Sequence, residues 1–479
     1  MAKKSIKKRL SAYRASLHHT DGASRYIRLY TLFVSLFLLL ASLIGALLTE
    51  ETAFFKHFFT LQITPSPLIT DYFALGGLGS TFFNAGILGL LVNLLMRLFR
   101  TRANATTLAA YFLVIAHGFY GLSVLSCLPI LLGGAVYCLV RRRPMGEHLP
   151  TVLFSTALGP FIGDFLFRYP PTHGGGTGLS LAGVLLALFF GILVGFAVPA
   201  LISGTSGMHR GYSLYKAGLA IGLLGVFCYA LFYRCLGLVA PPAPTAPSGG
   251  YGEGTLGYML FVNLFLLSLF LISLLWGYFS NNKSLEGFGP LLRSTGYGTD
   301  FVDRFGFPVC LINLAVYGLC LLALFDLFAL LPSFIPTLPE AAGFTGPTLG
   351  VIFAALTFSA DGQQIRTVWP IALGYALLFC LCFGVTAALG WSIPWTLGSQ
   401  VYLGGLAFAT GLCPFAGKYG AKVGVAAGFL SATICAVTAQ MHGGFVLYNG
   451  GFTAGLAALL LLPILDFYHI QPKFEDDTL

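Results

Sequence analysis

Charged residues are scarce in this chain of 479 residues. Only 9% of the residues are Asp, Glu, Lys or Arg, whereas a soluble domain carries about 25%. Hydrophobic residues make up 57%, and the mean hydropathy is +0.84. This composition excludes an ordinary soluble protein. The apolar runs are long enough to cross a hydrocarbon core of roughly 30 Å as helices, so the sequence predicts an integral membrane protein.

Several motifs that carry chemistry are also missing. The ten cysteines include no CxxC pair, and most lie in apolar runs, which gives neither a disulfide framework nor a zinc pattern. There is no GxxxxGK[ST] phosphate loop, no HExxH, no GxSxG and no carboxylate cluster with ligand spacing. We therefore expect no enzyme, no catalytic residues, no metal and no cofactor.

Positive charge is concentrated at the N-terminus, within residues 1–27. The run from Leu29 to Leu48 that follows is long and lacks a small-residue cleavage site, so we interpret it as a retained first span. The net charge of +9 is explained by membrane topology, with the basic tail lying in the cytoplasm near anionic lipid. Nucleic acid is not an expected partner.

The apolar segments form two sets of seven, in residues 28–239 and 255–470. Between them lies a linker rich in Pro, Gly and Ser, residues 240–254, and residues 471–479 form a C-terminal tail. We predict an all-α polytopic membrane protein with about 14 membrane segments. The third and fifth segments of each set are short and interrupted by Gly or Pro, so these segments either span or re-enter.

The two sets are copies of one unit. MHRGYSLYKAGLAIGL, from Met208 to Leu223, aligns without a gap on MHGGFVLYNGGFTAGL, from Met441 to Leu456. Asn84 aligns with Asn313 in a second matched stretch, and further matches follow in the same order. The sequence therefore predicts an internal duplication.

Seven segments per copy is an odd number, which predicts that the second repeat is inverted relative to the first. The 26 Lys and Arg residues support this topology, because only Lys56, Arg168 and Arg234 fall on the outer side when both termini lie inside. If one pair of short segments did not cross, each copy would have six crossings and the repeats would be parallel.

Three motifs carry a resemblance to a known family. They are HGGxxLYNxGF at His442–Phe452, the PFxG motif of both copies, and TFSADGQQIRTVWPIALG at Thr357–Gly374. With these motifs the chain resembles an uncharacterised family of bacterial multi-pass membrane proteins, the domain of unknown function 1576. The resemblance covers nearly the whole chain and implies a duplicated protein of the bacterial inner membrane. It implies no substrate and no catalytic residue.

Inverted repeats with interrupted helices are typical of secondary transporters. We therefore predict a transporter, or a channel, for a small polar solute, with its site between the repeats near the membrane midplane. The candidate substrate-binding residues are polar groups placed alike in both copies: His442, Tyr448, Asn449, His209, Tyr215, Asn84 and Asn313. The simpler alternatives are a helix-start turn with an interfacial tyrosine and, for the asparagines, hydrogen bonds between helices.

Charged groups within the apolar segments are the candidates for ion coupling. Asp361 is the preferred proton-coupling carboxylate, with Arg366 beside it, although a capped loop with a surface ion pair is the alternative. Asp164 and Lys418 occupy equivalent positions with opposite charge. They would pair across the repeat axis if the fifth segments re-enter the membrane, and would lie on opposite faces if those segments span it.

Two other functions remain open. A non-catalytic partner subunit is the first, and a membrane-embedded enzyme that uses Asp361 and His442 is the less favoured second. The expected partners are membrane lipid and a small polar solute, and a homo-oligomer is left open. We expect the protein in the cell membrane, with the N-terminus and the C-terminus inside.

Overall fold

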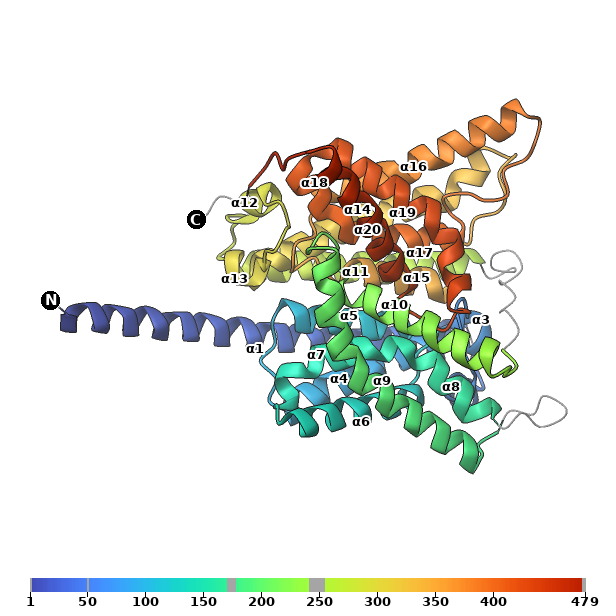
Figure 1. The fold of residues 1–479 in the computed structure, drawn as a ribbon, viewed down its shortest axis with the longest axis horizontal. Helices are drawn as coiled ribbons and strands as arrows, with labels where there is room; N and C mark the ends of the chain where they lie inside the picture. The colour runs from blue at the N-terminus through green and yellow to red at the C-terminus, as the bar shows by residue number, and fades with distance from the viewer. Residues whose placement is uncertain (1, 50, 170–177, 241–254, 476–479) are drawn as a thin grey trace.

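The computed structural model describes residues 2–49, 51–169, 178–240 and 255–475, and all regular secondary structure in these residues is helical (Figure 1). Eleven of the described helices are long and apolar enough to cross a membrane. Large apolar side chains on these helices are more than half exposed, as expected for contact with lipid; examples are Leu36, Leu185, Phe189 and Leu264. The prediction of an all-α polytopic membrane protein is confirmed.

The N-terminal half contains one helix for each predicted segment. The long helices are α1 (Ala2–Leu48), α4 (Leu78–Leu98), α6 (Val124–Arg141), α9 (Leu181–Met208) and α10 (Lys216–Tyr229, continued as a π-helix over Ala230–Cys235). A further span is α7 (Met145–Ser155) joined to α8 (Gly159–Arg168) through a 3₁₀ turn, and α5 (Ala105–His117) is shorter. Two small helices, α2 (Phe54–Ile63) and α3 (Tyr72–Gly76), lie between α1 and α4.

The C-terminal half repeats this order of helices. It contains α11 (Thr255–Ser280), α12 (Phe288–Arg293), α13 (Phe301–Phe305), α14 (Phe307–Phe334), α15 (Gly346–Ala355), α16 (Ile365–Ala388), α17 (Gln400–Ala409), α18 (Cys413–Tyr419), α19 (Ala421–Met441) and α20 (Asn449–Phe467). The three predicted segments that are not among the eleven long helices are α5, α15 and the interrupted α17–α18. Of the predicted linker, residues 241–254 lie outside the described residues, as do residues 476–479 of the tail.

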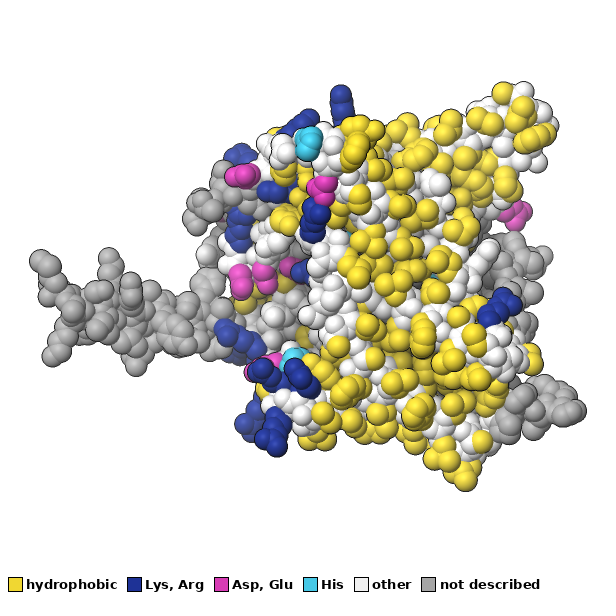
Figure 2. Space-filling view, in the orientation of Figure 1, with side chains coloured by type: hydrophobic (Ala, Val, Ile, Leu, Met, Phe, Trp, Pro, Cys, Tyr) yellow, Lys and Arg dark blue, Asp and Glu magenta, His cyan; other side chains and the backbone are white. Residues whose placement is uncertain are grey.

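Basic side chains gather at one end of the molecule, on the left of Figures 1 and 2, where α12, α13 and the N-terminus of α1 lie. We call this the basic end. Several contacts join segments there: Arg210 pairs with Asp466 at 2.8 Å, and the Tyr297 hydroxyl donates to the Arg210 carbonyl. Between the two ends, the visible face is mainly apolar (Figure 2). This distribution is typical of a protein embedded in a bilayer.

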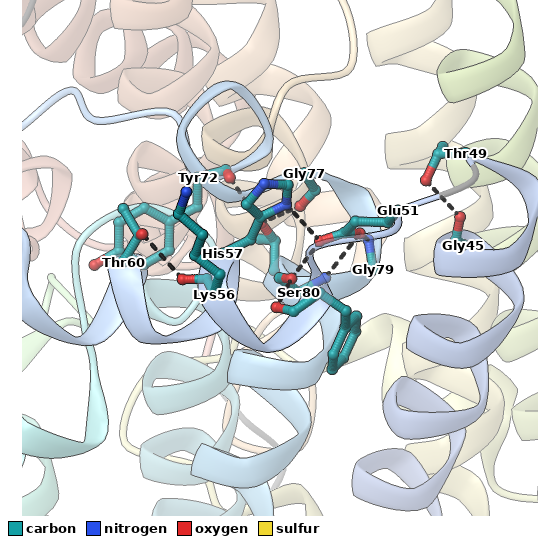
Figure 3. A network of polar contacts seen from close by, with 12 residues as sticks. Gly45, Thr49, Glu51, Lys56, His57, Thr60, Tyr72, Gly77, Gly79 and Ser80 are labelled. Carbon is teal, nitrogen blue, oxygen red and sulfur yellow. Dashed lines mark hydrogen bonds and ion pairs between the residues drawn. The ribbon is translucent and has the colours of Figure 1, made fainter.

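One buried carboxylate holds the start of α4 (Figure 3). Glu51 accepts hydrogen bonds from the backbone N–H groups of Gly79, at 2.9 Å, and Ser80, at 3.3 Å. It also accepts from the Ser80 hydroxyl and lies 3.2 Å from Nδ1 of His57. The first N–H groups of a helix have no acceptor within the helix and carry partial positive charge, so a carboxylate stabilises them. We did not predict this role from the sequence.

Replacing Glu51 with alanine should destabilise the protein by roughly 2 kcal/mol, because buried N–H donors lose their acceptor. The thermal unfolding midpoint of the purified protein in detergent would measure this. Glu340→Ala is the matched control, since Glu340 carries the same charge but is exposed. Equal midpoints for the two variants would contradict a capping role for Glu51.

Candidate functional site

The starts of α10 and α20 meet inside the protein, side by side in Figure 1. A Cβ atom on Gly218 would lie only 2.3 Å from the carbonyl carbon of Gly451, so the two backbones are in direct contact. From there the helices run in opposite directions, because Tyr229, further along α10, packs on Gly443, which precedes α20. Each helix therefore begins in the interior and runs beside the non-helical segment that leads into the other.

Matching contacts fix the non-helical segments before α10 and α20. The N–H of Leu214 donates to the carbonyl of Gly411, and the N–H of Leu447 donates to the carbonyl of Ala157, both at 2.9 Å. These acceptors lie in the 3₁₀ turns that interrupt α17–α18 and α7–α8. The 3₁₀ turns within α17–α18 and α7–α8 are therefore hydrogen-bonded to the segments that lead into α10 and α20.

The aligned tyrosines Tyr215 and Tyr448 lie at the centre of this arrangement. Both are buried, and their ring centroids are 5.7 Å apart. The Tyr215 hydroxyl donates to the carbonyl of Ala354 at 2.7 Å, whereas the Tyr448 hydroxyl has no partner among the described residues. The sequence placed both tyrosines in one site, and the structure brings them together with different hydrogen bonding.

The aligned asparagines hold the turns that follow α5 and α15. Nδ2 of Asn84 donates to the carbonyls of Gly118 and Leu122, at 2.8 and 2.9 Å. Nδ2 of Asn313 makes the equivalent bonds to Ser359 and Gln363, at 2.7 and 2.8 Å. Both amide N–H₂ groups are fully used by backbone carbonyls that would otherwise be unpaired in an apolar interior. This geometry favours interhelical hydrogen bonding over direct contact with a solute.

The aligned histidines are both buried, but their surroundings differ. Nε2 of His442 lies 2.9 Å from Oδ1 of Asn449, the first residue of α20. Neither ring nitrogen of His209 has a hydrogen-bond partner among the described residues. Lys216 occupies the position equivalent to Asn449, so the first copy places a cation where the second has an amide. The two copies of this motif therefore present different chemistry.

A cavity lies at the start of α20. About 60 Å³ of it is open to water-sized molecules. Its walls come from both halves and include Leu68, Ile69, Tyr120, Pro347, Val351, Gln400, Phe408, Leu447, Asn449 and Gly450. The segment that contributes Leu68 and Ile69 leads into α3, at the end opposite to the basic end (Figure 1). We call this space the α20 cavity.

Tyr120 and Gln400 are polar residues of the α20 cavity that sequence reasoning missed. The Tyr120 side chain is 2% exposed, and its hydroxyl has no hydrogen-bond partner among the described residues. The His117 ring packs on the Tyr120 ring, with 5.5 Å between the two centroids. Nε2 of His117 also has no hydrogen-bond partner among the described residues. The alignment contained a signal for Tyr120, because it stands in the first copy where Asp361 stands in the second.

Asp361 lies in the turn between α15 and α16, outside the spanning helices. The neighbouring carbonyl of Ala360 accepts from the N–H of Phe301 in α13, which places the turn at the basic end. Burial raises the pKa of Asp361 to about 7. The positive charge of Lys216 lowers this pKa, and the negative charges of Asp300 and Asp303 raise it further. Arg366, on the first turn of α16, is exposed. Asp361 can thus change charge near neutral pH.

Asp164 and Lys418 do not meet, which corrects the hypothesis that they pair across the repeat axis. Asp164 instead accepts from Arg168, at 2.7 Å, and from the Tyr233 hydroxyl. Lys418 lies over the Tyr297 ring at the basic end. α7–α8 is long enough to span, and α8 and α18 lie at opposite ends of the molecule, so the equivalent charges are far apart (Figure 1).

A second cavity opens at the basic end and was also not predicted. It measures about 570 Å³ and lies between the start of α5 and the start of α7. Arg100, Arg102, Asn104 and Glu147 line it. Within the described part of the chain, no group of three or more His, Cys, Asp or Glu side chains is placed to hold a metal ion.

Comparison with known proteins identifies the family. No curated protein and no solved structure matches the chain. One family model matches residues 50–234 and 280–467, which together cover most of both halves. The chain belongs to the family described as Protein of unknown function (DUF1576).

Proposed function

We propose that this protein is a secondary transporter, or a channel, for a small polar solute. In this proposal the two halves are inverted repeats, and the basic end faces the cytoplasm. The N-terminus and the C-terminus both lie on the cytoplasmic side of the cell membrane. The solute site lies between the repeats. The concentration of Lys and Arg at one end supports the orientation, because short cytoplasmic loops are enriched in these residues.

The matched contacts support the inverted repeat. Leu214 and Leu447 make equivalent backbone bonds, and Asn84 and Asn313 make equivalent pairs of bonds in the two halves. α10 and α20 begin at the equivalent residues Lys216 and Asn449, are in contact at Gly218 and Gly451, and run in opposite directions. Two copies with the same orientation in the membrane would send these helices in the same direction.

The observation that carries the transport proposal is that α10 and α20 both start within the protein. Backbone that is not helical leaves N–H and C=O groups unpaired, and at membrane depth this is tolerated only against protein or a polar cavity. Discontinuous helices that begin at a repeat interface form the solute and ion sites of many transporters. The α20 cavity lies at one of these helix starts.

The proposed roles follow from position. Asn449 faces the solute at the start of α20, His442 orients Asn449, and Tyr448 packs behind the site against Tyr215. Their counterparts His209 and Tyr215 support the start of α10. Asp361 is the proton-coupling carboxylate at the basic end.

The proposal is tested by the thermal stability of the purified protein against a panel of small metabolites and ions, at two pH values. A ligand at about 100 times its dissociation constant stabilises the folded state by roughly 2.7 kcal/mol. We expect one chemical class to raise the midpoint, and the same class to cross liposome membranes only when the protein is present. A stable protein that responds to no solute, carries none and co-purifies with another membrane protein would instead favour a partner subunit.

A further inference from the structure

Each of the three polar side chains that line the α20 cavity, Asn449, Gln400 and Tyr120, can donate a hydrogen bond. Oδ1 of Asn449 is occupied by Nε2 of His442 at 2.9 Å, so its Nδ2 hydrogens remain for a ligand. Oε1 of Gln400 accepts from the hydroxyls of Thr345 and Thr348, each at 3.0 Å, which leaves its Nε2 as a donor. The Tyr120 hydroxyl is buried and has no hydrogen-bond partner in the part of the chain that the structure describes.

The backbone adds to this set of donors. α20 has 19 residues and begins at Asn449, and Asn449 and Gly450 both line the cavity. The first N–H groups of a helix lack acceptors within the helix and carry partial positive charge. Since Gly450 has no side chain, a ligand can approach these groups closely.

Among the described residues, those that line the cavity include no carboxylate and no cationic side chain. Where the second copy has Asp361, this cavity has Tyr120, and where the first copy has Lys216, this cavity has Asn449. A cation in this cavity would have no carboxylate ligand among the described lining residues, and a divalent anion would have no cationic side chain to balance its charge. Hydrogen-bond donors and a helix start suit one negative charge.

From this donor set we infer that the α20 cavity binds a small monovalent anion of the size of chloride or nitrate. The centres of water-sized molecules have about 60 Å³ of space in this cavity, which is enough for a small ion. The inference rests on the proposed transport function, because it names the class of solute carried at that site. Tyr120, Asn449 and the first turn of α20 bind the ion, and His442 positions Asn449.

The test is a titration of the purified full-length protein with sodium chloride or sodium nitrate in place of sodium gluconate, at constant ionic strength. We expect a saturable rise in the thermal unfolding midpoint of the wild-type protein. Asn449→Asp keeps the shape and the acceptor for His442 but adds negative charge, and Tyr120→Phe removes one donor. Each should weaken the apparent affinity at least tenfold, because a hydrogen bond to a charged group is lost or opposed.

Tyr317→Phe is the matched control, because Tyr317 is a buried tyrosine of α14 that does not line the cavity. It should titrate like the wild-type protein. The absence of a saturable effect in the wild-type protein, or equal affinity in Asn449→Asp, would overturn the inference. Anion flux into liposomes is measured separately. Binding that is lost in Asn449→Asp, with no flux in the wild-type protein, would retain the site and reject the transporter.

Discussion

The Asp361→Asn variant is expected to be more stable than the wild-type protein at pH 8 and equally stable near pH 4. Burial raises the pKa of Asp361 to about 7, whereas the unfolded chain has a value of about 3.9. The folded protein therefore holds this proton more tightly than the unfolded chain, and stability falls as the pH rises from about 4 to about 7. Asparagine carries no such proton. We expect a difference of about 2 kcal/mol above pH 7, after allowing for screening by solvent.

The same substitution should remove the pH dependence of transport across roughly one unit on either side of pH 7. In the wild-type protein the carboxyl group is half protonated in this range, and its charge acts on Lys216 at the start of α10. Transport would be measured in liposomes with the solute that the ligand panel identifies, and stability by thermal unfolding in detergent from about pH 4 to about pH 8.

Asp466→Asn is the control for the Asp361 variant. It removes the same charge at the same end of the molecule, but Asp466 is 46% exposed and pairs with Arg210 on the surface. Its effect on stability should stay below about 1 kcal/mol. If Asp361→Asn kept the wild-type pH dependence of transport, Asp361 would not be the coupling group. If its stability followed the wild-type curve at every pH, the carboxyl group would be solvated.

The motif that occurs at Met208–Leu223 and again at Met441–Leu456 pointed to two segments of the chain with similar backbone contacts. A shared pattern of Gly, Tyr and His requires the same local backbone, and the starts of α10 and α20 are indeed built alike. The functions of the matched asparagines were harder to predict. Nδ2 of Asn84 donates to carbonyls more than thirty residues later in the chain. The turn after α5 brings these carbonyls to Asn84, so its N–H₂ group binds backbone and is not available to a solute.

Other residues of the site depend on geometry that no local pattern contains. Glu51 is one of three acids between the first two apolar segments, with Glu50 and Asp71. It caps α4 because Gly77, at a φ of +82°, brings that helix start against it. The sequence alignment matched Asp164 with Lys418. Whether they meet depends on whether their segments span or re-enter, and the length of an interrupted helix does not decide this. The only sequence signal for Tyr120 was its alignment with Asp361, because an uncharged residue stands in the first copy where the second has a carboxylate.

Gly218→Ala is expected to destabilise the protein by roughly 3 kcal/mol or more and to abolish transport. The added Cβ would lie 2.3 Å from the carbonyl carbon and 2.6 Å from the Cα of Gly451. These are backbone atoms that cannot rotate away, so α10 and α20 must separate. Overpacking of a tight interior costs about 1–3 kcal/mol and occasionally more. The loss of folded protein would be measured as the thermal midpoint and as the monodisperse fraction after purification in detergent.

Gly204→Ala in α9 is the matched control, because a Cβ on Gly204 has no heavy atom within 4 Å. It should keep the wild-type midpoint or raise it, since alanine favours a helix over glycine by up to about 1 kcal/mol. Gly455→Ala provides an intermediate case, because its Cβ would lie 2.9 Å from the Cβ of Leu219, a milder overlap than the 2.3 Å between Gly218 and the backbone of Gly451. The expected order of stability is therefore Gly204→Ala, then Gly455→Ala, then Gly218→Ala. Equal stability of the first and last variants would show that the two helix starts are not in contact, and the central argument for an interior site would fail with it.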